Sequence, residues 1–138
     1  MKKILILLII ALFSFSPIIG QNNSTKKADK LFDRLEFVKA ADEYLRLTKD
    51  SDDYYIISRL ADSYYNIFNT REAEKWYSKI VNKDPDAEVV FRYSQMLKAN
   101  GKYKESNVWM TKFSEMKPYD TRAIAFRNTP NYIDKIIK

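Results

Sequence analysis

The stretch ISRLADSYYNIFNTREAEKWYSKIVNKDP, residues 57–85, decides the fold of this 138-residue chain. Apolar residues recur at helical spacing in its first half, as at Leu60 and Tyr64, and again in its second half, as at Ala73 and Tyr77. The polar residues 69–70 separate the two halves. This spacing predicts two helices joined by a short turn.

Capping residues predict where these helices begin and end. Asn69 is expected to cap the second helix, with Glu72 as its capping-box partner three residues later. Asp84 and Pro85 are expected to open the following helix as its cap and first turn. Gly101 is expected to end that helix, because glycine accepts the left-handed backbone conformation.

The pattern repeats with a period of 33 residues, which indicates a repeat array. Trp76 aligns with Trp109, and Pro85 aligns with Pro118. A small residue recurs in three units (Ala40, Ala73, Ser106), and so does a large one (Tyr44, Tyr77, Met110). The small residues allow two antiparallel helices to cross closely, and the large ones fill the wedge between successive pairs. Because one pair cannot bury its own apolar face, at least about three stacked units are expected.

These positions resemble the tetratricopeptide repeat. The matching residues of the second and third units, which are predicted to pack the repeats, are Leu60, Ala61, Tyr64, Ala73, Tyr77, Pro85, Tyr93, Leu97, Ser106, Met110 and Pro118. Bulky Ile80 and Phe113 depart from the family's preference for a small residue. The resemblance implies an all-α solenoid of about three helix-turn-helix repeats plus a C-terminal capping helix.

The units are expected at residues 21–53, 54–86 and 87–119, with capping helices at 120–138. The first unit is the weakest match, since it has no proline at its end. Within the capping segment, Ala123, Ile124 and Phe126 are predicted to face inward, and residues 131–137 are predicted to form a last short helix that closes the array.

Residues 1–20 read as a secretory signal peptide. Lys2 and Lys3 precede an apolar run, and Gly20 offers a small residue for cleavage before Gln21. The alternative is an uncleaved membrane anchor, but the apolar stretch of about 12 residues is shorter than the ~20 that a span needs. The sequence therefore predicts export to the periplasm or the outer membrane.

The composition argues against catalysis and against a resident metal. The chain has no Cys and no His, and after residue 20 it has one Gly. These absences remove thiolate and imidazole ligands, the usual neutral-pH base and any Gly-rich phosphate loop. The acidic groups around Asp52 and Asp84 lack the ligand spacing of a calcium loop. We therefore expect no enzyme, no catalytic residue, no cofactor and no metal, and the modest charge of +6 does not favour nucleic acid.

A second, narrower resemblance is to the N-terminal part of bacterial OmpA-family outer-membrane proteins. Residues 27–32, 60–65, 74–77 and 122–132 carry it. The resemblance implies an exported scaffold near the outer membrane. In that family a peptidoglycan-binding domain follows the repeats, and this sequence stops at Lys138 before one would begin. The alternative interpretation is a truncated N-terminal module of a larger envelope protein.

A partner is expected on the concave face, which the first helices of successive repeats line. The predicted contact residues are Tyr55, Arg59, Asp62, Tyr65, Asn66, Phe91, Arg92, Gln95 and Lys98, with Glu88 beside them. Arg59 and Arg92 could grip carboxylates of a peptide, whereas Tyr65 and Phe91 could provide flat anchors. The alternative is a solvated face on which both arginines pair with nearby acids.

The sequence therefore favours a non-enzymatic scaffold that binds a protein or peptide in the cell envelope and meets a membrane only through that partner. Trp76 and Trp109 are expected to pack between repeats, although an exposed aromatic ladder is the alternative. A carboxylate-based enzyme and a structural fragment of a longer protein are the competing hypotheses.

Overall fold

The computed structural model describes residues 24–129, and within this range the chain forms only helices and their connections. The helices are α1 (Lys26–Asp33), α2 (Phe37–Leu47), α3 (Tyr54–Asn66), α4 (Thr70–Ser78), α5 (Ala87–Ala99), α6 (Tyr103–Met116) and α7 (Thr121–Asn128). The predicted signal peptide and the predicted last helix at 131–137 lie outside the described residues.

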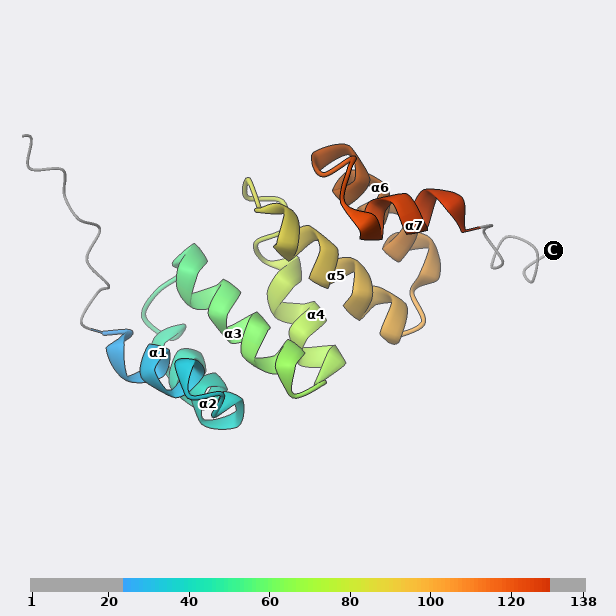
Figure 1. Cartoon of the computed structure of the whole chain (residues 1–138). Helices are drawn as coiled ribbons and strands as arrows, with labels where there is room; N and C mark the ends of the chain where they lie inside the picture. Colours follow the sequence, from blue (N-terminus) through green and yellow to red (C-terminus); the bar gives the residue numbers. More distant parts are fainter. Residues whose placement is uncertain (1–23, 130–138) are drawn as a thin grey trace, which may run out of the picture.

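The helices stack in chain order, each packed against the next, and α3 also contacts α5. We call α1, α3, α5 and α7 the A helices and α2, α4 and α6 the B helices. Figure 1 shows the turns from A to B helices along the lower edge of the array and the connections from B to A helices along the upper edge. The prediction of an all-α array of helix pairs is confirmed.

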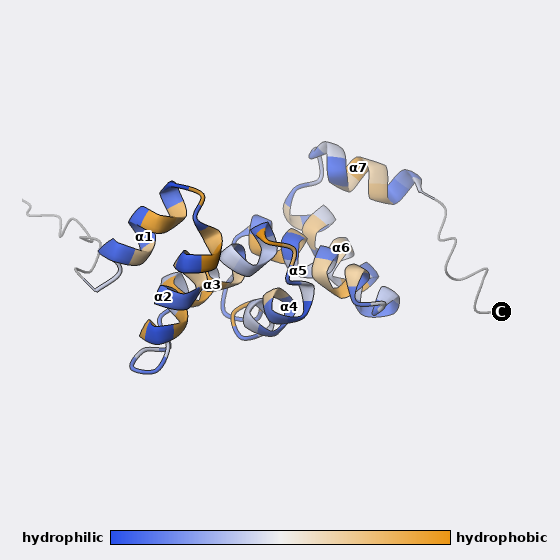
Figure 2. Cartoon of the chain, turned by 90° about the horizontal axis from the view of Figure 1, so that it is seen from below, coloured by the Kyte–Doolittle hydropathy of each residue, from blue (hydrophilic) through white to orange (hydrophobic). Residues whose placement is uncertain are grey.

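The core runs through the array where A and B helices cross. Ala40 and Ala73 are fully buried at the predicted close crossings, and Ser106 takes the same place in the third unit, where its hydroxyl donates to the Ser94 carbonyl at 2.8 Å. Bulky Ile80 and Phe113 are fully buried too, so they fill the core rather than disrupt it. Figure 2 shows hydrophobic residues interleaved with hydrophilic ones along the helices, as expected for amphipathic helices in a thin stack.

The caps differ from expectation at two places. Asn69 caps α4 by accepting from the Glu72 amide at 3.3 Å, but the Glu72 carboxylate accepts from the Trp76 indole at 3.2 Å instead of completing a capping box. The cap of α5 is Asp86, which accepts from the Val89 amide at 2.9 Å. The prediction of Asp84 as this cap and Pro85 as the first turn was wrong, because both residues lie in the connection before α5, where Asp84 has a left-handed backbone (φ 51°).

The three A-to-B turns share one backbone geometry. In each turn, a backbone amide just after the A helix donates to a carbonyl in the last turn of that helix. The pairs are Glu36 to Leu31 (2.9 Å), Asn69 to Tyr64 (2.9 Å) and Lys102 to Leu97 (2.8 Å). This is the Schellman arrangement, which needs a left-handed residue just before the donor. Leu35 (φ 62°), Phe68 (φ 58°) and Gly101 (φ 81°) occupy that place, one period apart.

On α7, Ala123 is buried and Phe126 is half-buried, but the prediction that Ile124 faces inward was wrong, since its side chain is 40% exposed.

The other residues predicted to pack the repeats lie as follows. Tyr77 and Leu97 are fully buried, while Tyr93 and Met110 are nearly so. The two repeat prolines lie in connections, and Pro118 is exposed, with its carbonyl accepting from Arg127 at 2.7 Å. Trp76 is buried, whereas Trp109 is half-buried and packs edge-on against Tyr93 with ring centroids 5.3 Å apart.

Candidate functional site

The candidate site is the face that the A helices present away from the B helices, which we call the A-helix face. The nine predicted contact residues lie on α3 and α5. Tyr55, Asn66 and Lys98 are exposed, and the other six are half-buried. Neighbouring A helices come close enough here for side chains of one unit to contact the next at each junction between units.

At the first junction, α3 reaches back to the buried carboxylate of Asp29 on α1. Asp29 accepts from the hydroxyl groups of Thr25 (2.8 Å), Tyr44 (2.5 Å) and Tyr55 (2.8 Å), so all three donors are hydroxyls. Arg59 donates to the Tyr55 hydroxyl at 3.3 Å and lies 4.2 Å from the centroid of the Phe32 ring. Tyr55 and Arg59 of the second unit are therefore fixed on the first.

At the second junction, α5 reaches back to Asp62 on α3 in the same way. Asp62 accepts from the Tyr77 hydroxyl at 2.5 Å and forms an ion pair with Arg92 at 2.8 Å. The Arg92 guanidinium also lies 5.2 Å from the Tyr65 ring centroid. Asp29 and Asp62 are one period apart, as are Tyr44 and Tyr77, so the two junctions use equivalent positions.

The charges of this second junction stabilise one another. Burial first, and then the Asp62 carboxylate, raise the pKa of the Tyr77 phenol. Burial is the largest single influence on the Arg92 guanidinium and would lower its pKa, but Asp62 and Tyr77 together outweigh burial, so the net pKa is raised. Tyr77 therefore stays protonated as a donor, and Arg92 stays charged.

At the third junction, Arg122 of α7 contacts the preceding A helix, as Arg59 and Arg92 do at the first two junctions. It donates to Glu88 on α5 at 3.0 Å and to Asp120 at 2.9 Å. Its guanidinium lies 4.2 Å from the Phe91 ring centroid and 4.9 Å from that of Phe113. The third unit has Gln95 and Met110 at the positions of the Asp–Tyr pair, so the third junction is built from different residues.

The predicted residues thus separate into two groups. Arg59, Asp62 and Arg92 hold neighbouring units together through the contacts given above. Asn66 and Lys98 remain at the exposed end of this face, where Asn66 donates its amide to the Asp62 carbonyl at 2.7 Å. Within residues 24–129, the Lys98 ammonium makes no hydrogen bond or ion pair.

Sequence reasoning missed Asp29, Phe32 and Arg122 of these junctions, together with the hydrogen-bond partners Thr25 and Asp120. The period of 33 contained the signal for two of them, since Asp29 aligns with Asp62 and Phe32 with Tyr65. Arg122 gave no such signal, because the residue one period after Arg92 is Ala125.

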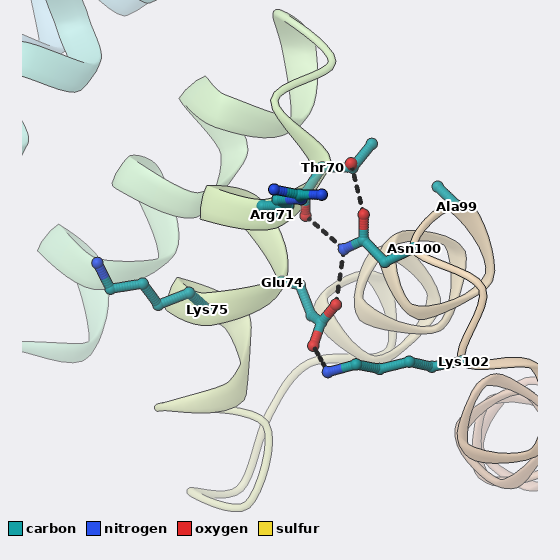
Figure 3. Close-up of a pocket in the computed structure, with 7 residues that line it drawn as sticks. All are labelled: Thr70, Arg71, Glu74, Lys75, Ala99, Asn100 and Lys102. Atoms are coloured by element: carbon teal, nitrogen blue, oxygen red, sulfur yellow. Dashed lines mark hydrogen bonds and ion pairs between the residues drawn. The ribbon is translucent and has the colours of Figure 1, made fainter.

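A separate open hollow of about 640 Å³ lies where the start of α4 meets the turn between α5 and α6. Figure 3 shows Asn100 at its centre, linked to Thr70 and Glu74, while Lys75 points away. The Asn100 amide donates to Glu74 at 2.6 Å and to the Thr70 carbonyl at 3.0 Å, and its oxygen accepts from the Thr70 hydroxyl at 2.6 Å. These bonds join the second and third units, which gives the hollow a structural role.

Residues 24–129 lack the features of two further classes of site. No group of three or more carboxylates is placed there to hold a metal ion. No helix in the same part of the chain has the length and apolar character needed to cross a membrane.

Comparison with known proteins identifies the fold. No family model matches the chain, and no curated protein matches it. Among solved structures, the chain is similar to the second TPR domain of human RPAP3, determined by NMR in complex with the HSP70 peptide SGPTIEEVD. The TM-score is 0.64 at 19% sequence identity, and the match covers 83% of this chain and 92% of that one. The fold is therefore that of a tetratricopeptide-repeat domain.

Proposed function

We propose that this chain is a non-catalytic protein-interaction module that binds an extended peptide on the A-helix face. The observation that carries the proposal is that three successive junctions, at Asp29, Asp62 and Glu88, fix the A helices side by side as one continuous surface. A surface whose side chains are already held in place loses little entropy when a ligand binds.

The groups left free on this surface define the ligand. Lys98 offers an unpaired ammonium, and Asn66 still has an amide oxygen that can accept a hydrogen bond. Tyr55 is 39% exposed and provides a flat apolar contact at the other end of α3. These groups suit a peptide that presents a carboxylate near Lys98, a backbone amide near Asn66 and an apolar side chain near Tyr55.

The similarity to the RPAP3 domain supports this proposal at the level of the fold, since that domain holds a peptide. It does not transfer the identity of the peptide. Arg59 and Arg92 were predicted as direct contacts, and in the present proposal their first role is to hold the surface in shape.

Site-specific photocrosslinking in cells tests the proposal. A photoreactive amino acid replaces Lys98 or Asn66, and the matched controls replace Lys83, in the connection between α4 and α5, or Thr111 on α6, both exposed and off the A-helix face. We expect the same partner to be captured from positions 98 and 66 and not from 83 and 111. Capture from the control positions alone would overturn the proposal.

A charge reversal provides the quantitative arm of this test. Lys98→Glu is expected to reduce recovery of the captured partner about tenfold, because a repulsive charge replaces an attractive one. Its thermal midpoint should match that of the parent protein, since Lys98 makes no contact that the fold needs. An unchanged recovery would remove Lys98 from the site.

We also propose, on the sequence alone, that the protein is exported, with cleavage before Gln21. Cell fractionation with N-terminal sequencing of the purified protein tests this, and a mature protein that begins at Met1 would contradict it. The resemblance to the N-terminal region of OmpA-family proteins supports an envelope location. The alternative of a truncated module is tested by sequencing the reading frame past Lys138, where an in-frame continuation would favour it.

A further inference from the structure

Two large apolar side chains project into solvent from strained turns. Leu35 is 72% exposed and Phe68 is 75% exposed, and both have the left-handed backbone that the A-to-B turn requires. A bulky residue in this conformation is an outlier that costs about 1–2 kcal/mol relative to the right-handed region. Gly101 occupies the same place in the third unit, where it avoids that cost.

Packing within the chain does not account for these two residues. Neither belongs to the buried core or to the half-buried residues around it. Strain and exposed apolar surface both act against stability here, and a glycine would remove both. We therefore expect Leu35 and Phe68 to contact something other than residues 24–129.

The surroundings of these turns indicate what that feature is. The A-to-B turns lie along one edge of the array (Figure 1), and we call this the turn edge. Its exposed members are apolar Leu35, Val38, Ile67, Phe68 and Tyr103, and basic Arg34, Arg71 and Lys104. Within residues 24–129, the side chains of these three basic residues make no hydrogen bond or ion pair.

The acidic groups of the turn edge are mostly neutralised. Glu36 is paired with Lys39 at 2.7 Å, Glu72 with Lys75 at 3.4 Å and Glu74 with Lys102 at 2.5 Å. Asp33 and Glu105 are the exposed acids that remain without an ion pair in the described range. Free cations therefore outnumber free anions around the two apolar side chains.

We propose that the turn edge binds an anionic lipid surface, with Leu35 and Phe68 entering the boundary between headgroups and acyl chains. Apolar side chains flanked by Lys and Arg are the pattern by which a protein lies on a membrane without crossing it. The two side chains project from separate turns, so they suit a soft, continuous surface better than a protein pocket. The proposal replaces the expectation that the chain meets a membrane only through a partner.

Vesicle binding of glycine variants tests the proposal. The probes are vesicles of phosphatidylcholine mixed with phosphatidylglycerol and vesicles of phosphatidylcholine alone, and co-sedimentation gives the partition coefficient. We expect binding to the mixed vesicles that weakens with added salt, and weaker binding to the neutral ones. Leu35→Gly and Phe68→Gly should each lower the partition coefficient roughly tenfold, because each removes one inserted side chain.

We expect the glycine variants to keep the fold, since glycine adopts the left-handed backbone of these turns without steric strain. Their thermal midpoints should equal or exceed that of the parent protein. The matched control is Tyr119→Gly, which removes a 91% exposed aromatic ring from the connection between α6 and α7, on the opposite edge. It should leave vesicle binding unchanged.

Three results would overturn the proposal. The first is a parent protein that does not bind the mixed vesicles. The second is a Leu35→Gly/Phe68→Gly double variant that binds them as the parent does. The third is loss of vesicle binding in Tyr119→Gly as large as that in the double variant. If the parent does not bind vesicles but is crosslinked to a protein that the double variant fails to capture, the turn edge is a protein-binding surface instead.

Discussion

In the second unit, α3 and α4 are joined by a buried tyrosine hydroxyl on a carboxylate, Tyr77 to Asp62, and the next unit closes this pair with Arg92. In the third unit, α5 and α6 have Gln95 and Met110 at the same positions. There the contact is made by Ser94, which donates to the Met110 sulfur at 3.5 Å, and by the Ser106 hydroxyl on the Ser94 carbonyl.

The comparison separates what the repeat backbone requires from what its side chains add. The backbone requires small residues at the crossing and a left-handed turn, and both units have them. A carboxylate at the position of Asp62 is not required, because the third unit packs with Gln95 there. Where this carboxylate occurs, as at Asp29 and Asp62, it couples one unit to the next, since one of its donors comes from the following repeat.

The largest expected effect comes from removing the carboxylate in the second unit. Asp62→Ala should lower the free energy of unfolding by about 3 kcal/mol, because it leaves the buried Tyr77 hydroxyl and the half-buried Arg92 without their acceptor. Urea unfolding measures the change. The equivalent substitution in the third unit, Gln95→Ala, should cost about 0.5 kcal/mol or less, and equal losses at the two positions would refute the comparison.

The next effect addresses the feature that both units share. Ala73→Trp should lower the free energy of unfolding by about 1–3 kcal/mol, because the larger ring does not fit the close crossing of α3 and α4. Thermal unfolding checks it. Ser78→Trp, on an exposed position of α4, is the control and should change stability little; a parent-like midpoint for Ala73→Trp would show that the crossing is misplaced.

A smaller effect compares the turns of the two units. Gly101→Leu should cost about 1 kcal/mol from backbone strain alone, since no atom lies within 4 Å of the added Cβ position. Phe68→Gly should give a gain of up to about 1 kcal/mol for the opposite reason. Denaturant unfolding of both variants measures these changes. An increase in the free energy of unfolding for Gly101→Leu would contradict the claim that the left-handed turn strains a bulky residue.

The smallest effect concerns pH at the third junction. Hydrogen bonds from Arg122 lower the pKa of the Asp120 carboxyl from 3.8. A lowered pKa in the folded state stabilises the protein above the unfolded-state value, and this stabilisation is lost as the pH falls through the lower, folded value. Asp120→Asn keeps a good helix cap and should show a smaller fall in thermal midpoint on acidification than the parent.

The control for this prediction is Asp52→Asn, in an exposed connection where Asp52 makes no hydrogen bond or ion pair with residues 24–129. It should retain the parent's acid dependence. An Asp120→Asn protein with the same acid dependence as the parent would show that the Asp120–Arg122 contact contributes nothing to folding.

Most of the fold could be predicted from the sequence because helix pairs depend on local spacing. Residues such as Leu60, Ala73 and Tyr77 carry both the helical period and the period of 33, and the structure places each in the core or beside it. Helix starts were harder, as at Asp84 and Asp86. Two acids that flank a proline are equally good caps by residue type, and only the path of the connection distinguishes them.

The site was less predictable, because its contacts join helices that are distant in the sequence. Arg59 and Arg92 were found by their spacing, but their ring partners Phe32 and Tyr65 depend on how closely two A helices approach. That distance is set by the whole stack. Arg122 could not be found by register, since it lies one turn earlier on its helix than the period predicts.

The junctions also have a direction. Asp29, Asp62 and Glu88 each receive a donor from the unit that follows, from Tyr55, Arg92 and Arg122 respectively. As the chain leaves the ribosome, every unit therefore emerges lacking its last donor and is completed only when its successor has been synthesised. Removing units from the 3′ end of the gene would leave the acidic group of the new last unit without its donor. Removing units from the 5′ end would instead leave a hydroxyl or a guanidinium without its acceptor, and water solvates these groups readily.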